Sequence, residues 1–207
     1  MNEPVFLFPD WPAPVNVRAA VSTRIGGVSH FDYASFNLAS HVGDSAEAVA
    51  TNRELLVASL SLPEMPVWLS QVHGVAVLRR DGSGSGAIPH YPEYDACYSN
   101  QPATVCAVLT ADCLPVLFCS QNGQEVAATH AGWRGLLDGV LETTVSEFAC
   151  PRGDIMAWLG PAIGPHSFEV GPDVIDRFLE RWQAYGKTHV AACFNPHGEQ
   201  RWLCDLY

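Results

Sequence analysis

The chain has 207 residues, a hydrophobic fraction of 48%, a charged fraction of 16% and a formal net charge of -11. This composition is typical of a folded globular protein. Cations are scarce and Lys187 is the only lysine, which argues against binding to nucleic acid or to an anionic membrane surface. No signal peptide or bilayer-spanning run is recognisable, so we expect a cytoplasmic protein whose seven cysteines are reduced.

Strand-like and helical patterns follow one another irregularly along the chain. Apolar runs predict strands over residues 15–23, 66–72, 103–110, 115–120, 125–130 and 155–160. Apolar periodicity predicts helices over residues 45–60, capped by Asp44, over 136–148, and over 172–183, which opens with Pro172. The run 81–92, rich in glycine and serine, predicts a surface loop. Because the order is irregular, we expect an α+β or mixed, layered domain and not a regular doubly wound sheet.

Three of the predicted strands are followed by a side chain that can bind a metal. His73 follows the run 66–72, Cys113 follows the run 103–110, and His130 ends the run 125–130. Two imidazoles and a thiolate are a ligand set of catalytic zinc, which keeps one coordination position open. The long spacings leave the alternative that each residue is a hydrogen-bonded histidine or a small buried cysteine.

These residues stand in blocks that resemble the bacterial YfiH-like family, also called the laccase-domain or multicopper polyphenol oxidoreductase family. The blocks are STRIGGVS (22–29), FNL (36–38), HVGD (41–44), QVHG (71–74), TADCLPV (110–116), HAGWRG (130–135) and GPAIGPHSFEVG (160–171). The resemblance implies a layered α/β/α fold with a mixed sheet, similar to cytotoxic necrotising factor domains. It also implies a single YfiH-like domain over residues 1–207, without the C-terminal tail into which relatives continue.

The resemblance assigns the metal ligands to His73, Cys113 and His130, with zinc as the ion and copper as the alternative. It implies phosphorolysis of adenosine, inosine and methylthioadenosine to the base and a ribose 1-phosphate, with deamination of adenosine as a side activity. The expected partners are therefore a small nucleoside and phosphate, and the assembly is left open between a monomer and a homodimer. Older descriptions of the family name a copper polyphenol oxidase, and some members are described as peptidoglycan editing factors.

Phosphorolysis requires positive charge near the phosphate, and arginine must supply it here. Arg134 lies beside His130 and before a predicted helix, and Arg24 lies in a Gly-Gly loop. Asn37 is a candidate for binding the ribose or the base, and Asp112, next to Cys113, is a candidate for proton transfer. Each of the four has a structural alternative: an ion pair at the helix start for Arg134, and a turn contact for the others.

Other chemistries fit parts of the pattern. Cys113 with His73 or His130 as its base would make a cysteine hydrolase, suited to amides in peptidoglycan precursors, and a metal-dependent amidohydrolase is related to it. A true laccase needs a second, histidine-rich copper cluster, and the eight histidines include no His-x-His pair. A copper-dependent laccase is therefore less favoured than a single-metal enzyme. A binding protein without catalytic activity is a further alternative.

Overall fold

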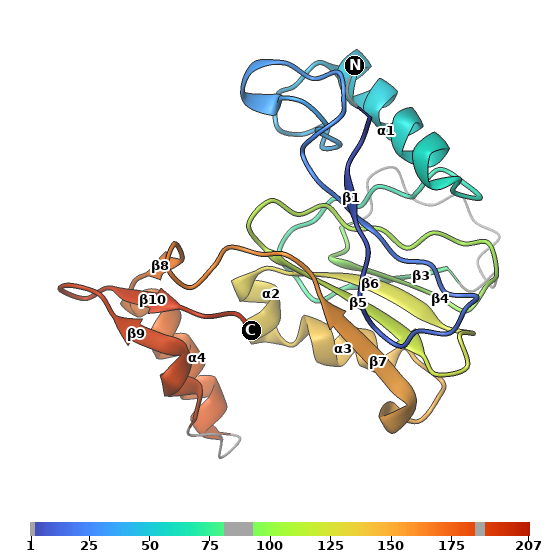
Figure 1. Cartoon of the computed structure of the whole chain (residues 1–207). Helices are drawn as coiled ribbons and strands as arrows, with labels where there is room; N and C mark the ends of the chain where they lie inside the picture. Colours follow the sequence, from blue (N-terminus) through green and yellow to red (C-terminus); the bar gives the residue numbers. More distant parts are fainter. Residues whose placement is uncertain (1–2, 81–92, 185–188) are drawn as a thin grey trace.

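The computed structural model describes residues 3–80, 93–184 and 189–207, and a five-stranded mixed sheet forms its centre (Figure 1). Its strands are β3 (Val77–Arg80), β4 (Ala96–Ser99), β5 (Leu114–Ser120), β6 (Val126–Ala131) and β7 (Ile155–Leu159), in the order β3-β4-β6-β5-β7. β3 and β4 are parallel, and the other neighbouring pairs are antiparallel. The prediction of an α+β fold with a mixed sheet is confirmed. The loop predicted over residues 81–92 lies outside the described residues.

Two short helices, α2 (Trp133–Asp138) and α3 (Val140–Ser146), lie along one face of this sheet (Figure 1). The core between them and the strands is apolar, and its fully buried members include Tyr98, Leu114, Val116 and Val140. The prediction of one continuous helix over 136–148 is wrong. Gly139 has a φ of 99°, which ends α2 and starts α3, because a left-handed residue cannot continue a right-handed helix.

A second core forms around α1 (Ala46–Leu60), which confirms the helix predicted over 45–60. The N-cap is Ser45, whose hydroxyl accepts from the Ala48 N–H, so the expectation that Asp44 caps the helix is wrong. Asp44 instead accepts from the Ser45 N–H at 2.8 Å. Leu56 of the helix packs on Phe36 and on other residues of this part, which also contains β1 (Phe6–Leu7), β2 (Val21–Ser22) and the 3₁₀ turn η1 (Phe31–Tyr33).

The C-terminal part holds α4 (Pro172–Ala184), which confirms the helix predicted over 172–183. Beside it, β8 (Glu169–Val170), β10 (Trp202–Cys204) and β9 (Phe194–Pro196) form a small antiparallel sheet in that order. Two 3₁₀ turns complete the elements, η2 (Arg152–Asp154) before β7 and η3 (His189–Cys193) before β9. In the described ranges, no helix has both the length and the apolar character needed to cross a membrane. All seven cysteines are free thiols.

Three strand predictions are wrong in whole or in part. Of residues 15–23, only Val21–Ser22 pairs, with β1, and residues 66–72 and 103–110 belong to no strand. In the run 103–110, backbone groups form hydrogen bonds with polar side chains and not with the backbone of a neighbouring strand. The Val105 N–H donates to Glu64 Oε1 at 2.9 Å, and Leu109 pairs with the amide of Gln71. The apolar runs therefore identified non-helical chain that is in part shielded from solvent, but not its strand pairing.

Candidate functional site

The three predicted ligands lie together at one end of the sheet. β5 and β6 pair Leu114 with Ala131, so the register brings Cys113, just before β5, next to the end of β6 that carries His130. His73 lies in the segment that precedes β3. One donor atom from each of the three residues lies within 4.8 Å of the other two.

The separation of Cys113 Sγ and His73 Nε2 matches that of two donor atoms on one metal ion. Cys113 Sγ lies 3.7 Å from His73 Nε2, and the rings of His73 and His130 meet edge to face with centroids 4.8 Å apart. Zinc bonds of about 2.0–2.3 Å in a tetrahedron put neighbouring donor atoms roughly 3.3–3.8 Å apart. The donor set of two imidazoles and a thiol suits zinc and copper alike, and three protein ligands leave a position for water or substrate.

Asp95 is a candidate site residue that the sequence patterns did not indicate. Its carboxylate is fully buried and accepts from His130 Nδ1 at 2.8 Å. It also accepts from three successive backbone N–H groups, those of Val72, His73 and Gly74, at 3.2, 2.9 and 2.7 Å. One side chain thereby fixes both histidines, and it leaves Nε2 of His130 as the ring atom free to bind a metal. The sequence offered one clue, an aspartate that directly precedes the apolar run of β4.

Glycine and strained backbone allow the close approach of the ligands. His73 has a φ of 61°, a left-handed conformation that the hydrogen bond from its own N–H to Asp95 helps to hold. A Cβ on Gly132 would lie 2.5 Å from His73 Cδ2 and 3.2 Å from Cys113 Sγ. Gly132, the first glycine of the HAGWRG block, is therefore needed because the His73 ring and the Cys113 thiol occupy the space that a side chain would fill.

The two histidines differ in their readiness to bind a metal. Burial lowers the pKa of His73, and the positive charges of His130 and of Arg134 lower it further, so its imidazole is neutral near pH 7. Burial opposes a charge on His130 as well, but its hydrogen bonds to Asp95 and Cys113 outweigh burial and raise its pKa to about 9. Metal binding therefore has to displace a proton from His130.

Arg134 and Asp112 lie near the three ligands. The guanidinium of Arg134 stacks on Trp133, its carbon 4.5 Å from the ring centroid, and its charge reaches His73. In the part of the chain that the structure describes, no hydrogen bond or ion pair of Arg134 is found. Asp112 is exposed, and its carbonyl accepts from the Ile163 N–H at 2.9 Å, which joins the Cys113 loop to the GPAIGP block.

Arg24 and Asn37 are occupied within their own loop. Arg24 donates from Nε and Nη2 to the Ala34 carbonyl at 2.9 and 2.7 Å. Asn37 donates to the Ala39 carbonyl and to Asp44, and it accepts from the Ala39 N–H at 3.0 Å. These contacts are the turn contacts named as their structural alternatives. Both residues nevertheless line the same groove as the three ligands.

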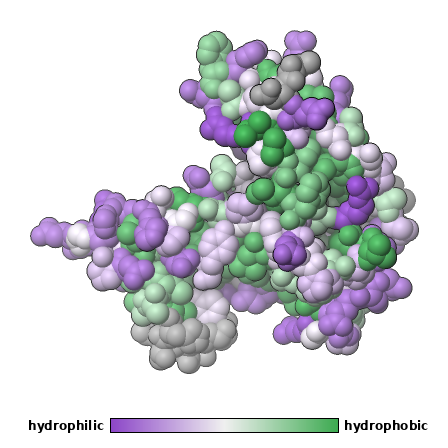
Figure 2. Space-filling model, viewed as in Figure 1, coloured by the Kyte–Doolittle hydropathy of each residue, from purple (hydrophilic) through white to green (hydrophobic). Residues whose placement is uncertain are grey.

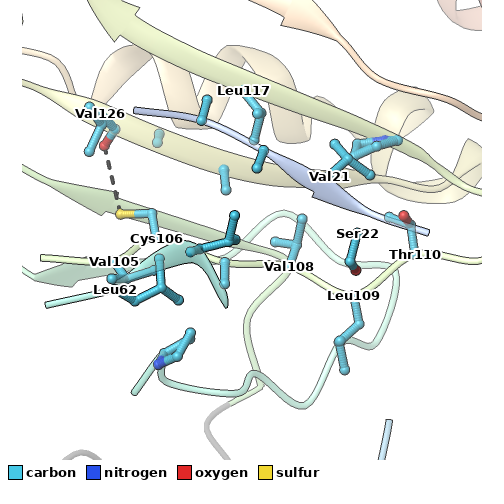
Figure 3. Close-up of a pocket in the computed structure, with 18 of the residues that line it drawn as sticks. Val21, Ser22, Leu62, Val105, Cys106, Val108, Leu109, Thr110, Leu117 and Val126 are labelled. Carbon is cyan, nitrogen blue, oxygen red and sulfur yellow. Dashed lines mark hydrogen bonds between the residues drawn. The ribbon is translucent and has the colours of Figure 1, made fainter. Parts of the chain in front are cut away.

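This groove has a volume of about 2150 Å³ and reaches from the three ligands along the sheet. In Figure 3, Leu117 of β5 and Val126 of β6 lie on one side, and Cys106, Val108 and Leu109 of the extended run lie on the other. Figure 2 shows hydrophobic residues gathered on the face below the part that contains α1. The ligands thus stand at the wall of a large, mainly apolar groove, where a small molecule has access to them.

The fold and the site define an α+β protein with a candidate metal centre of two histidines and one cysteine. Residues 18–207 match the family model described as multi-copper polyphenol oxidoreductase laccase, and the chain belongs to that family. The chain is 52% identical over 201 residues to a protein of Escherichia coli strain K12 named purine nucleoside phosphorylase YfiH, covering 97% of this chain and 79% of that protein. A Haemophilus influenzae protein named purine nucleoside phosphorylase is 54% identical, with coverage of 96% and 78%.

Two solved structures share the fold. Neisseria meningitidis protein NMB0706 superposes with a TM-score of 0.87 at 44% identity, over 98% of this chain and 79% of that one. YlmD from Geobacillus stearothermophilus superposes with a TM-score of 0.81 at 29% identity, over 97% and 77%. Both similarities extend across nearly the whole chain, so the arrangement of sheet and helices is common to these proteins.

Proposed function

We propose that this protein is a zinc-dependent purine nucleoside phosphorylase. The observation that carries the proposal is the convergence of His73, Cys113 and His130 on one point at the wall of an open groove. The names of the relatives supply the reaction, cleavage of a purine nucleoside by phosphate. Adenosine, inosine and methylthioadenosine are the proposed substrates, and deamination of adenosine is the proposed side activity.

The reaction requires a phosphate-binding group, a group that transfers a proton, and contacts to the ribose and the base. A phosphate oxygen bonds to C1′ of the ribose as the bond from C1′ to the purine nitrogen breaks, and the electron pair and a proton end on the base. We assign the phosphate to Arg134, because stacking on Trp133 orients its guanidinium and its charge already reaches His73. We assign proton transfer to the exposed Asp112 carboxylate beside Cys113, and contacts to ribose and base to Arg24 and Asn37 at the groove wall.

The metal would be held by His73, Cys113 and His130, and when bound it supplies Lewis acidity and an activated water, as deamination requires. Asp95 keeps the ring of His130 in the orientation and tautomer that binding demands. Among the described residues, these three form the one cluster of metal-binding side chains found. A laccase needs a second cluster, so this observation favours a single-metal enzyme over a polyphenol oxidase.

The proposal is tested by release of adenine from adenosine, assayed with and without phosphate, and before and after removal of metal by a chelator. We expect turnover to require phosphate, to be lost with the metal and to return with zinc. His130→Ala should abolish turnover, and His166→Ala, a change at an exposed histidine, is the matched control that should retain it. If turnover depends on phosphate but is unchanged after the metal is removed, the metal has no role in the reaction. If adenine is released equally well without phosphate, the protein is not a phosphorylase.

A second candidate function rests on the contact between Cys113 Sγ and His73 Nε2 at 3.7 Å. A thiol beside an imidazole is the arrangement of a cysteine hydrolase, and amides of peptidoglycan precursors are its proposed substrates. Metal-free protein distinguishes the two candidates. A hydrolase should cleave the amide after chelation and lose that activity in Cys113→Ser, whereas the phosphorylase should be inactive after chelation.

A further inference from the structure

The side chain of Gln71 pairs with the backbone of Leu109 through two hydrogen bonds. Gln71 Nε2 donates to the Leu109 carbonyl at 2.7 Å, and the Leu109 N–H donates to Gln71 Oε1 at 2.7 Å. The amide thus imitates one residue of a neighbouring strand, in a region where neither segment belongs to a β-ladder. Thirty-eight residues separate the two partners along the chain.

The positions of the two partners connect this pair to the candidate metal centre. Gln71 stands two residues before His73, and Leu109 stands four residues before Cys113. The Gln71–Leu109 pair therefore joins the segment that carries one ligand to the segment that carries another. Two other connections are already present: Asp95 links His73 to His130, and the pairing of β5 with β6 links Cys113 to His130.

The three ligands form a triangle, and each of these connections fixes one side of it. Among the hydrogen bonds of the described residues, the remaining connections set the separation of His73 from Cys113 indirectly, through His130. That separation, 3.7 Å between Nε2 and Sγ, is the distance that a shared metal ion requires. We propose that Gln71 is a positioning residue that holds Cys113 and His73 at metal-binding distance. This inference rests on the metal site of the proposed function and not on the reaction assigned to it.

The test measures zinc affinity by competition with a chromophoric chelator, in the absence of nucleoside. Gln71→Met keeps the length of the side chain and removes both hydrogen bonds. We expect it to weaken zinc binding by about tenfold, the lower end of the loss for partners that contact a ligand directly, because Gln71 acts through the backbone of Leu109. Gln71→Glu keeps the acceptor for the Leu109 N–H but sets a second carboxylate oxygen against the Leu109 carbonyl, so we expect a loss here as well. Gln121→Met, at an exposed glutamine whose amide makes one long bond of 3.4 Å to Gly153, is the control and should leave the affinity unchanged.

A double-mutant cycle separates positioning of the thiolate from general loosening of the fold. In a Cys113→Ser background there is no thiolate to position, so Gln71→Met should cost less than about twofold in affinity. Cobalt reports the same event by absorption, and the thiolate-to-cobalt charge-transfer band should weaken in Gln71→Met and persist in Gln121→Met.

Circular dichroism of the metal-free proteins establishes that the variants are folded. Unchanged zinc affinity in folded Gln71→Met, or an equal loss in both backgrounds, would overturn the inference, and Gln71→Glu provides the same comparison if Gln71→Met does not fold. Because no step uses nucleoside, a wild-type protein that binds zinc but fails to release adenine contradicts the phosphorylase and leaves the role of Gln71 standing.

Discussion

The carboxylate of Asp95 accepts a hydrogen bond from Nδ1 of His130 at 2.8 Å, and the two side chains are 0% and 5% exposed. Burial alone would raise the pKa of Asp95, but the hydrogen bonds from His130 and from the backbone of Gly74 and Val72 outweigh it and lower the pKa. The carboxylate is therefore ionised at neutral pH and accepts hydrogen bonds from His130 and from three backbone N–H groups. It is the electrostatic centre around which two of the three ligands are arranged.

Replacing Asp95 with asparagine should damage the metal site and the fold together. The new amide would set its NH₂ group against N–H groups that now donate to a carboxylate. We expect zinc affinity to fall by about 10- to 100-fold and the free energy of unfolding to fall by about 3 kcal/mol. Chelator competition and urea unfolding measure the two effects.

Asp176→Asn, a change at an exposed residue of α4, is the control for Asp95→Asn. It should alter the free energy of unfolding by less than about 0.5 kcal/mol. If Asp95→Asn bound zinc as tightly as the wild type, the role assigned to this carboxylate would be wrong.

Gly132→Ala should weaken metal binding with little effect on the fold. The added Cβ would stand 2.5 Å from His73 Cδ2, so the ring must turn and carry Nε2 away from Cys113. We expect zinc affinity to fall by about tenfold, with a loss of stability of about 1 kcal/mol or less. Gly164→Ala is the matched control, because a Cβ there meets no atom within 4 Å. Equal zinc affinity in the two variants would contradict the expectation.

Arg134→Gln should act on phosphate and not on the nucleoside. It removes the charge that stacks on Trp133 near the ligands. Because a hydrogen bond to a charged group contributes about 1.5–3 kcal/mol, we expect kcat/KM for phosphate to fall by about 10- to 100-fold. Initial rates with phosphate varied at saturating adenosine measure this change. The exposed Arg152 supplies the control variant Arg152→Gln. A kcat/KM for phosphate that stays the same in Arg134→Gln would remove this residue from the phosphate site.

Glu125 should make the stability of the fold sensitive to acid. The buried carboxylate accepts from the Tyr98 hydroxyl at 2.6 Å and from the backbone of Ala149 and Cys150 at 2.7 and 3.1 Å. Burial would raise the pKa of Glu125, but these hydrogen bonds outweigh it and lower the pKa below its ordinary value. A group whose pKa is lower in the folded state stabilises the fold above its unfolded pKa, here about 4.3, and that contribution is lost as the pH falls below this value.

Glu125→Gln measures this contribution. We expect it to lower the free energy of unfolding by about 2 kcal/mol at pH 7, and the difference from the wild type to shrink below a pH of about 4. Urea unfolding of the wild type and of Glu125→Gln, at pH 7 and below a pH of about 4, measures the free energy of unfolding. Glu142→Gln, at an exposed residue of α3, is the control. A difference that is the same at both pH values would show that Glu125 acts through packing and not through its charge.

Much of the fold could be predicted because some signals are local. The apolar periodicity over residues 45–60 predicted α1, although not its cap at Ser45, Pro172 marked the start of α4, and the apolar runs of β5, β6 and β7 predicted the central antiparallel strands. The break at Gly139 was missed, because a glycine inside an apolar periodicity does not reveal its φ. The run 103–110 fits the strand prediction as well as a true strand does, because unpaired extended backbone and a paired strand share the same apolar pattern.

The sequence by itself determined the chemistry that is available: His73, Cys113 and His130 as donors, and arginine as the principal source of positive charge. It also determined which blocks resemble a known family. Only the tertiary structure decided that the three donors meet, that Asp95 lies behind two of them, and that Gln71 joins the remaining pair of segments. Those relationships connect residues 17 to 57 positions apart, and such contacts depend on strand register and on side-chain hydrogen bonds between loops. A one-dimensional pattern of residue types carries neither of them.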